Sequence, residues 1–280
     1  MDKYTEELQS GERFAFGKNW ARFLSSVTDQ HIVEAQRSLS EMLGTRSLVG
    51  KRFLDIGCGS GLFSLAARRL GATVYSFDYD PTSVSCTRQL RDRYDRESGE
   101  WVVEQGSILD ITYLRKLEKF DVIYSWGVLH HTGDMWKALE NISNLATPGS
   151  VLFIAIYNDQ GHASQRWLKI KRLYNRLPHW LQGAILLPVF IRLWGPTMAR
   201  DLLSGHPLKA WKAYGLGDRG MSPWRDVVDW IGGYPFEVAK PEEIFSFYRN
   251  KGFVLQRLKT CGGGIGCNEF VLQRMKVEQP

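Results

Sequence analysis

Short apolar segments and amphipathic segments alternate along the chain from residue 51 onward. The apolar segments have the length of buried strands and fall at 51–57, 73–79, 101–107, 120–126 and 150–157. The segments between them carry the periodicity of helices, as at 60–71 and 81–94. This alternation predicts an α/β fold with a doubly wound, mostly parallel sheet and helices on both faces.

The alternation stops after Tyr157 and resumes at residue 240. There a helix is predicted over 240–252, and two strands follow at 253–260 and 268–275. The turn Gly262-Gly263-Gly264 indicates that these two strands form an antiparallel hairpin. The expected organisation is a helical N-terminal extension at 1–50, one core domain formed by 51–157 and 241–280, and an insertion at 158–240.

Composition narrows the class of protein. The chain has 280 residues, of which 44% are hydrophobic and 24% charged, as in a globular domain with a sizeable core. Its start is polar, and its longest apolar run, 183–191, is interrupted by Pro188 and too short to cross a bilayer. The four cysteines form no CxxC pair and are expected to be reduced thiols. We therefore expect a cytoplasmic protein.

The net charge of +6 belongs to the insertion. Residues 158–240 hold twelve Lys and Arg against six Asp and Glu, whereas the rest of the chain holds 24 of each. Six of the ten tryptophans also lie in this segment. The insertion is therefore predicted to have a different role from the domain that it interrupts.

A glycine-rich turn follows the first predicted strand and reads Asp55-Ile56-Gly57-Cys58-Gly59-Ser60-Gly61. Small residues between a strand and a helix let a nucleotide approach the backbone and the helix N-terminus. The spacing is GxGxG rather than the GxGxxG of nicotinamide-binding turns, and Asp55 would repel a pyrophosphate but attract an ammonium group. Asp78 ends the next strand, at the spacing of a carboxylate that accepts from ribose hydroxyls. A ligand with both an amino group and a ribose indicates S-adenosylmethionine.

Five segments, in this order, resemble the successive motifs of the class I S-adenosylmethionine-dependent methyltransferases. They are FLDIGCGSG at 53–61, VYSFDYD at 74–80, EQGSILD at 104–110, FDVIYSWGVLHHTGD at 120–134 and GSVLFIAIYN at 149–158. Within the family, the chain most resembles small-molecule methyltransferases of the ubiquinone-biosynthesis type. The resemblance implies a seven-stranded sheet whose last strand is antiparallel, S-adenosylmethionine as cofactor, and transfer of its methyl group.

The same resemblance implies roles for individual residues. Asp55 would hold the amino group of the methionine part and Asp78 the ribose, while Tyr79 and Ile108 would flank the adenine. Ser107 stands where many relatives have an Asp, and its hydroxyl can accept a hydrogen bond but brings no charge. The full expected set of cofactor-binding residues is Asp55, Gly57, Cys58, Gly59, Gly61, Asp78, Tyr79, Ser107, Ile108 and Ser125.

Two adjacent histidines, His130 and His131, follow the predicted strand 120–126. The carboxyl end of that strand reaches the crevice where open α/β sheets bind ligands, so both histidines are expected near the transferred methyl group. Histidine has a pKa suited to a general base for an oxygen nucleophile. His130 matches a family position that varies with chemistry and is the favoured catalytic base, whereas His131 is expected to support the loop. No metal site is predicted, because adjacent side chains point in different directions.

The insertion begins with two contrasting stretches. Basic and apolar side chains alternate over 164–182, and the apolar stretch 183–196 is predicted to form a hairpin or a broken helix. An insertion after the fifth strand lies above the carboxyl edge of the sheet, so we predict a cap over the substrate. Trp and Leu beside Lys and Arg also suit peripheral contact with an anionic membrane through 164–196. The other interpretation is packing on the core or a homodimer.

Candidate contacts to the methyl acceptor come from the core and from the insertion. The expected set is Trp126, Tyr157, Arg219, Trp224 and Tyr234, with Asp229 and Trp230 as further candidates. In the N-terminal extension, the aromatic residues of 13–24 either close over cofactor or substrate or anchor the extension in the core.

We therefore predict O-methylation of a small, partly apolar, hydroxylated metabolite. Tyr124-Ser125-Trp126-Gly127 replaces the Asn/Asp-Pro-Pro-aromatic motif of enzymes that methylate amino groups of nucleic-acid bases, which argues against a nucleic-acid substrate. Two alternatives stay open. One is an RNA methyltransferase that docks through the basic insertion, and the other is an S-adenosylmethionine-binding protein without catalysis.

Overall fold

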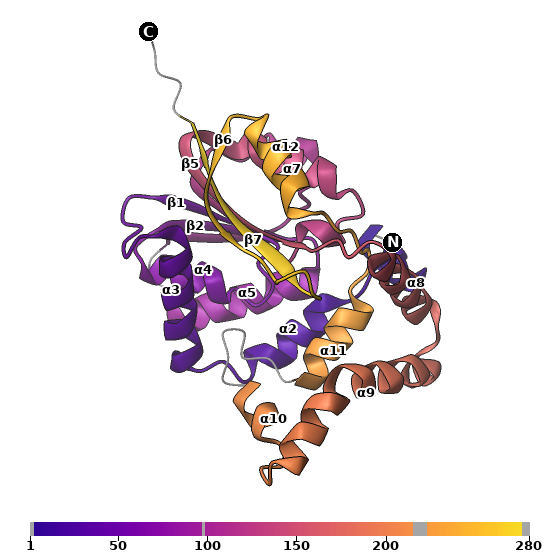
Figure 1. Cartoon of the computed structure of the whole chain (residues 1–280). Helices are drawn as coiled ribbons and strands as arrows, with labels where there is room; N and C mark the ends of the chain where they lie inside the picture. Colours follow the sequence, from indigo (N-terminus) through magenta and orange to yellow (C-terminus); the bar gives the residue numbers. More distant parts are fainter. Residues whose placement is uncertain (1–2, 97–98, 215–222, 276–280) are drawn as a thin grey trace.

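The computed structural model describes residues 3–96, 99–214 and 223–275, and a seven-stranded sheet lies at its centre (Figure 1). The strands are β1 (Arg52–Ile56), β2 (Thr73–Asp78), β3 (Trp101–Gln105), β4 (Phe120–Trp126), β5 (Ala146–Tyr157), β6 (Phe253–Lys259) and β7 (Cys267–Arg274). Their order is β3-β2-β1-β4-β5-β7-β6. Strands β1 to β5 run parallel, whereas β7 pairs antiparallel with both β5 and β6. The predicted α/β fold with an antiparallel end is confirmed.

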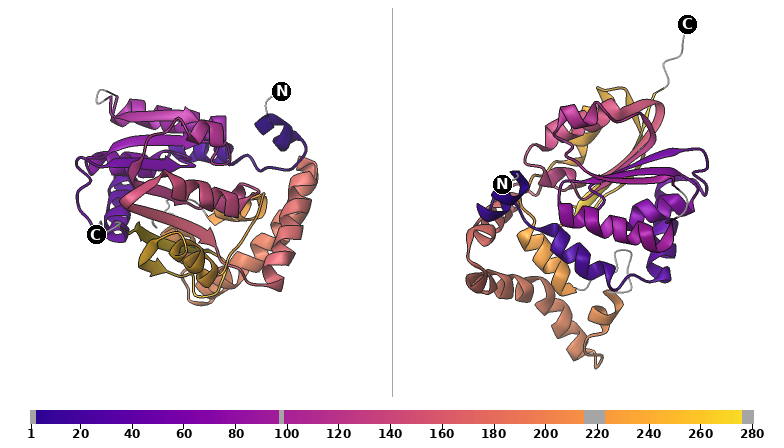
Figure 2. Two further views of the ribbon diagram at one scale, coloured as in Figure 1. Left: turned by 90° about the horizontal axis from the view of Figure 1, so that it is seen from above. Right: turned by 180° about the vertical axis from the view of Figure 1, so that it is seen from behind.

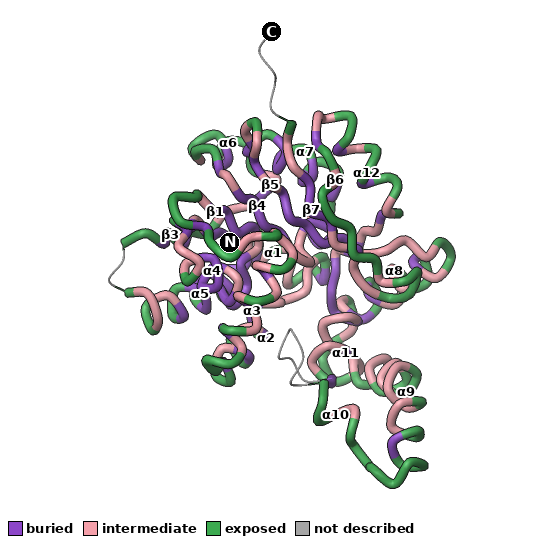
Figure 3. The backbone as a smooth tube through the Cα atoms, turned by 60° about the vertical axis from the view of Figure 1, so that its left-hand side comes forward, coloured by how far each residue is buried: buried purple, intermediate pink, exposed green. Residues whose placement is uncertain are grey.

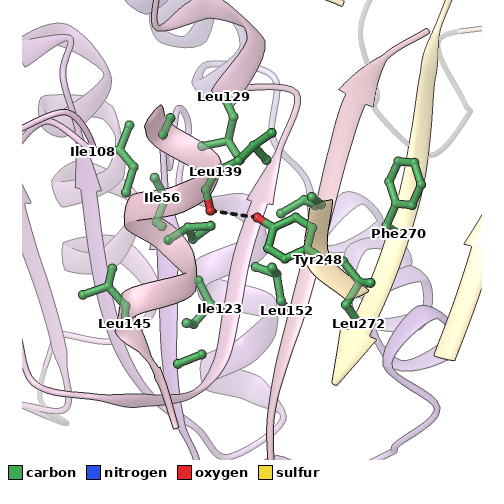
Figure 4. Packing of buried hydrophobic residues seen from close by; sticks show 14 of the residues in the cluster. Ile56, Ile108, Ile123, Leu129, Leu139, Leu145, Leu152, Tyr248, Phe270 and Leu272 are labelled. Carbon is green, nitrogen blue, oxygen red and sulfur yellow. Dashed lines mark hydrogen bonds between the residues drawn. The ribbon is translucent and has the colours of Figure 1, made fainter. Parts of the chain in front are cut away.

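Helices cover both faces of the sheet, because successive side chains of each buried strand point to opposite sides. In β1, Phe53 belongs to one core cluster and its neighbour Leu54 to the other. The Phe53 face is covered by α3 (Asp29–Leu43), α4 (Leu62–Arg69) and α5 (Pro81–Tyr94), and the Leu54 face by α6 (Ile111–Leu114), α7 (Met135–Leu145) and α12 (Pro241–Arg249). Figure 4 shows the second cluster, where the hydroxyl of the fully buried Tyr248 donates to the Leu139 carbonyl at 3.2 Å.

The insertion is helical over most of its described length and has a small core of its own. Its helices are α8 (His162–Arg176), α9 (His179–Leu203), α10 (Lys209–Tyr214) and α11 (Pro223–Gly232). Tyr174 of α8 is buried with Val227 and Ile231 of α11 against one face of α9. Figures 1 and 2 place α9 and α10 at one end of the molecule, away from the sheet.

Helix α9 runs through Pro188 and Pro196, so the predicted hairpin or broken helix over 183–196 is wrong. Each proline removes only one backbone donor, and the apolar side chains of α9 that pack in the cap core hold the helix on both sides of Pro188. None of the described helices is long and apolar enough to span a membrane.

The N-terminal extension folds as α1 (Lys3–Gln9), α2 (Phe16–Leu24) and α3, and it reaches the carboxyl edge of the sheet. The backbone N–H of Gly17 in α2 donates to Asp80 Oδ2 at 2.7 Å. Asp80 also accepts from the Thr82 N–H at 2.8 Å and so caps α5. A Cβ at Gly17 would lie 2.6 Å from Thr82 Cβ, so the close approach of α2 to α5 requires glycine.

Candidate active site

A cavity of about 950 Å³ opens at the carboxyl ends of β1, β2, β4 and β5. The strand order reverses between β1 and β4, which is where open α/β sheets bind their ligands. The other walls come from α1, α2 and the cap helices α9, α10 and α11, and from the hairpin between β6 and β7. The volume is near the upper end for sites of small molecules and cofactors.

The glycine loop forms one wall of the cavity and has left-handed backbone angles. Gly57, Gly59 and Gly61 have φ of 74°, 55° and 82°. A Cβ on Gly57 would lie 2.5 Å from Val128 Cγ2, and one on Gly59 would lie 2.9 Å from Trp20 Nε1. The loop is therefore pressed between the segment after β4 and helix α2, and side chains there would displace both.

Two carboxylates lie at the cavity wall, Asp55 near the end of β1 and the half-buried Asp78 at the end of β2. Asp55 is 2% exposed and accepts from Ser64 Oγ at 2.5 Å, and burial raises the pKa of its carboxyl to about 7. Asp78 accepts from the backbone N–H of Gly59 at 3.0 Å and of Asp80 at 2.9 Å. Burial likewise raises the pKa of Asp78, to about 6. Both groups would be stabilised in their charged forms by a cationic or hydroxyl-bearing ligand.

Next to Asp78, the cavity wall contains the two side chains that are expected to flank adenine. Tyr79 and Ile108 line this part, with Tyr4 of α1 in edge contact with Tyr79 at 5.5 Å between ring centroids. The Arg13 guanidinium lies 4.7 Å over the Tyr79 ring. Ser107 is on the wall, and its hydroxyl already accepts from the Leu109 N–H at 3.2 Å.

Gly61 and Ser125, both expected to bind the cofactor, are not on the cavity wall. A Cβ on Gly61 would meet Thr87 Cγ2 at 2.9 Å, so this glycine serves the close packing of the loop on α5. Ser125 is fully buried, and its hydroxyl donates to the Ile56 carbonyl at 3.1 Å between β4 and β1. Cys58 does line the cavity, and Thr87 donates to its sulfur at 3.2 Å.

His131 lies on the cavity wall, in the 3₁₀ turn η1 (Leu129–His131) that follows β4. Its Nδ1 is 2.6 Å from the Pro235 carbonyl oxygen, and its ring centroid is 4.9 Å from that of Phe16. Burial lowers the pKa of His131 to about 3. A neutral ring whose Nδ1–H donates to a carbonyl keeps its lone pair on Nε2.

His130 is not on the cavity wall, contrary to the expectation that it faces the substrate. It is fully buried, its ring lies 3.9 Å from that of Tyr157, and its Nδ1 accepts from the Tyr157 N–H at 3.3 Å. Burial lowers the pKa of His130 well below its usual range. Among the described residues, its Nε2 has no hydrogen-bond partner. The structure thus exchanges the positions expected for the two histidines, because the tight turn sends adjacent side chains to different sides.

The other half of the cavity is mostly aromatic, and α11 adds the carboxylates Asp226 and Asp229. Trp126 and Tyr157 line it from the sheet, and Asp229 and Trp230 line it from α11. The side-chain amide of Asn19 in α2 donates to the Asp229 carboxylate, which joins the extension to the cap. Phe14, Phe16 and Trp20, whose role was left open, lie on the wall as well.

The remaining candidates from the insertion lie away from the cavity wall. Tyr234 is buried, and its hydroxyl accepts from Arg172 Nε at 3.2 Å. Trp224 is 40% exposed and packs on Phe190 of α9, with ring centroids 5.2 Å apart. Arg219 lies outside the described residues.

Sequence reasoning missed three polar residues around the cavity, Arg13, Asn19 and Asp80. Arg13 donates to the His131 carbonyl at 3.1 Å as well as covering Tyr79. Asp80 is the second acid of the motif VYSFDYD, and that position was a signal for it. No local pattern marks Arg13 and Asn19, because their roles depend on how the extension docks on the sheet.

A family model described as a methyltransferase domain matches residues 29–186, more than half of the chain. The chain therefore belongs to this family. The sheet order and the motifs place it in the class I S-adenosylmethionine-dependent methyltransferases, as predicted, and S-adenosylmethionine is its cofactor.

Individual relatives agree with this assignment. The ubiquinone biosynthesis O-methyltransferase of Brucella ovis is 33% identical over 119 residues, which are 40% of this chain and 44% of the relative. The match thus spans less than half the length of that relative. Magnesium protoporphyrin IX methyltransferase from Synechocystis with bound SAH aligns over 92% of this chain and 94% of its own, with a TM-score of 0.55 and 15% identity. A Haloferax volcanii methyltransferase, solved in a complex with the Trm112 methyltransferase activator, aligns over 94% and 97%, with a TM-score of 0.54 and 13% identity. The two structures support the fold.

Proposed function

We propose that the protein transfers the methyl group of S-adenosylmethionine to a hydroxyl oxygen of a small, partly apolar acceptor. The observation that carries this proposal is that one cavity joins two carboxylates, the buried Asp55 and the half-buried Asp78, to the ring of His131. The similarity to ubiquinone biosynthesis O-methyltransferases supports an oxygen acceptor.

The carboxylate half of the cavity suits the cofactor. Asp55 would pair with the ammonium group of the methionine part, and Asp78 would accept from the ribose hydroxyls. Gly57 and Gly59 leave the backbone open to the ligand, and Tyr79 and Ile108 flank the space for the adenine. When bound, S-adenosylmethionine supplies a methyl group on a sulfonium and leaves as neutral S-adenosylhomocysteine.

In the aromatic half, Nε2 of His131 would accept the proton that the acceptor hydroxyl loses as its oxygen takes the methyl group. Its neutral ring, fixed by Pro235, is ready to accept at any pH near neutrality. His130 has a different role in this proposal, because it holds the end of β5 through the Tyr157 N–H.

The acidity of the hydroxyl group limits which acceptors a histidine base can serve. Each pKa unit between proton donor and acceptor costs about 1.4 kcal/mol, so a phenol, with a pKa of about 10, loses its proton to a histidine more readily than an aliphatic alcohol does. Trp126, Tyr157 and Trp230 offer ring faces to such an aromatic acceptor. We therefore propose a phenolic or enolic hydroxyl as the methylated group.

The test is methyl transfer from labelled S-adenosylmethionine to phenols, alcohols and amines matched in size. We expect label on phenols, and we expect the transfer to fall at least about 100-fold in His131→Ala while cofactor affinity stays within a few-fold. Label that appears only on amines, or equal transfer by His131→Ala, would overturn the proposal.

A further inference from the structure

The outward face of α9 is apolar, although a helix on the surface of a protein normally turns charged residues to the solvent. Leu187 and Ile191 are 57% and 58% exposed, and Trp180 and Leu203 are 80% and 88% exposed. Residues 180, 187 and 191 share one face of the helix. The opposite face packs in the cap core through Ile185, Leu186, Val189 and Leu193, and Phe190 and Trp194 join the same core from the sides of the helix. Helix α9 is therefore apolar on both sides, and Figure 3 shows it as half-buried or exposed over most of its length, at the end of the molecule away from the buried sheet.

The surface around this face is strongly positive. Residues 160–214, all of them described, contain nine Lys and Arg but a single carboxylate, Asp201. Asp201 is buried and caps α10, where it accepts from the Ala210 N–H at 2.6 Å. The exposed cations are Arg166, Lys169, Arg172 and Arg176 on α8, Arg192 and Arg200 on α9, and Lys209 and Lys212 on α10. Of these, Arg176 pairs with Glu12 of the extension at 2.9 Å.

We infer that the outward face of α9, with the cations of α8, α9 and α10 around it, docks on an anionic lipid surface. An exposed apolar stripe beside Lys and Arg is the composition of helices that lie in a membrane interface. A second copy of the chain fits less well, because a symmetric contact would bring the same cations together without carboxylates to pair with them.

This docking would bring the bilayer close to the active site. Leu193 and Trp194, only a few positions beyond Ile191, line the cavity, and Leu193 lies on the side of α9 away from Ile191. One helix thus separates the lipid from the aromatic half of the cavity. Delivery of an apolar acceptor from the bilayer rests on the proposed methyl transfer, whereas binding of the lipid surface does not.

The test is flotation of the full chain with vesicles of phosphatidylcholine alone or of equal parts phosphatidylcholine and phosphatidylglycerol. We expect binding to the anionic vesicles only, and a tenfold or greater loss in the variant Leu187→Gln/Ile191→Gln. The matched control is Val33→Gln, because Val33 on α3 is 59% exposed but lies outside the cap. The pair Arg192→Gln/Arg200→Gln should weaken binding about 5-fold per charge removed, whereas Arg249→Gln on α12 should have no effect.

Three results would overturn the inference. The first is no binding to anionic vesicles at low salt, and the second is binding that Leu187→Gln/Ile191→Gln leaves unchanged. The third is that Leu187→Gln/Ile191→Gln disrupts a different complex instead. That complex would be a dimer formed without lipid, or a complex with RNA in a protein that does not bind vesicles. Because flotation needs neither cofactor nor acceptor, its failure is distinguishable from a failure of methyl transfer.

Discussion

Nδ1 of His131 donates to the carbonyl oxygen of Pro235 at 2.6 Å, across 104 positions of the chain. A carbonyl can only accept, so this contact fixes which nitrogen of the imidazole carries the proton. It also ties the turn after β4 to the segment that leads from the cap back to the core. The orientation of the proposed base thus depends on the correct docking of the cap.

We expect His131→Ala to lose catalysis but not cofactor. A positioned general base contributes about 100-fold or more to the rate, so kcat should fall by that amount while the affinity for S-adenosylmethionine, measured by calorimetry, stays within a few-fold. His162→Ala, an exposed histidine at the start of α8, is the matched control. A wild-type kcat in His131→Ala would exclude His131 as the base.

His130→Ala should lose stability instead. The ring is fully buried against Tyr157, and removing a buried ring of this size costs about 3 kcal/mol of unfolding free energy. Denaturant unfolding should show this loss, while kcat per folded molecule falls less than in His131→Ala. The reverse pattern, an unchanged unfolding free energy with abolished turnover, would return His130 to the role of base.

Asp55→Asn should stabilise the cofactor-free protein at neutral pH and weaken cofactor binding. Burial raises the pKa of Asp55 from 3.8 to about 7, so the folded state keeps a proton that the unfolded chain has already released. The unfolding free energy of the parent protein therefore falls as the pH rises from 3.8 to about 7. Asp55→Asn cannot release this proton and should not show the decrease. Above a pH of about 7, the unfolding free energy of Asp55→Asn should exceed that of the parent protein by at most about 4 kcal/mol. Below the pKa of Asp55 in the unfolded chain, the two proteins should not differ in this way.

The same variant tests the pairing of Asp55 with the ammonium group of the cofactor. Loss of a charged hydrogen bond of about 1.5–3 kcal/mol should weaken binding about 10- to 100-fold, measured by calorimetry. Cofactor affinity in the parent protein should rise as the pH increases through about 7, and this dependence should flatten in Asp55→Asn. An Asp55→Asn protein that binds normally would remove Asp55 from the cofactor site.

Gly57→Ala should lower the free energy of unfolding by more than the left-handed backbone at this position alone explains. The control is Gly44→Ala, because Gly44 has φ of 67° with nothing within 4 Å of an added Cβ, and it should lose about 1 kcal/mol. At Gly57 the added carbon also meets Val128, so about 2 kcal/mol more should be lost. Val128→Ala should restore part of that difference, and equal losses at the two glycines would contradict the close approach.

The core fold and half of the site could be predicted because their signals are local. In β1 and the turn after it, the strand, the glycines and Asp55 are contiguous in sequence, so their relative geometry follows from the turn itself. The same holds for Asp78 at the end of β2. Ser125 misled the prediction, because a strand residue near the site can equally turn its hydroxyl to the neighbouring strand, as it does toward Ile56.

The cap could not be predicted to the same degree. Both faces of α9 are apolar, so no periodicity says which face is buried and which is exposed. Trp224 and Tyr234 have the composition of substrate contacts, but packing on Phe190 and the hydrogen bond from Arg172 take them away from the cavity. Long-range docking decided these positions.

The sequence by itself therefore determined the family, the mostly parallel sheet with its antiparallel end, and the two carboxylates Asp55 and Asp78 at the cavity wall, because each depends on residues that are close along the chain. Only the tertiary structure decided which of two adjacent histidines faces the cavity. The turn η1 sends His130 under Tyr157, and the Pro235 carbonyl, contributed from far along the chain, holds His131 at the wall. A choice between neighbouring side chains depends on what packs around them, and that information is not local in the sequence.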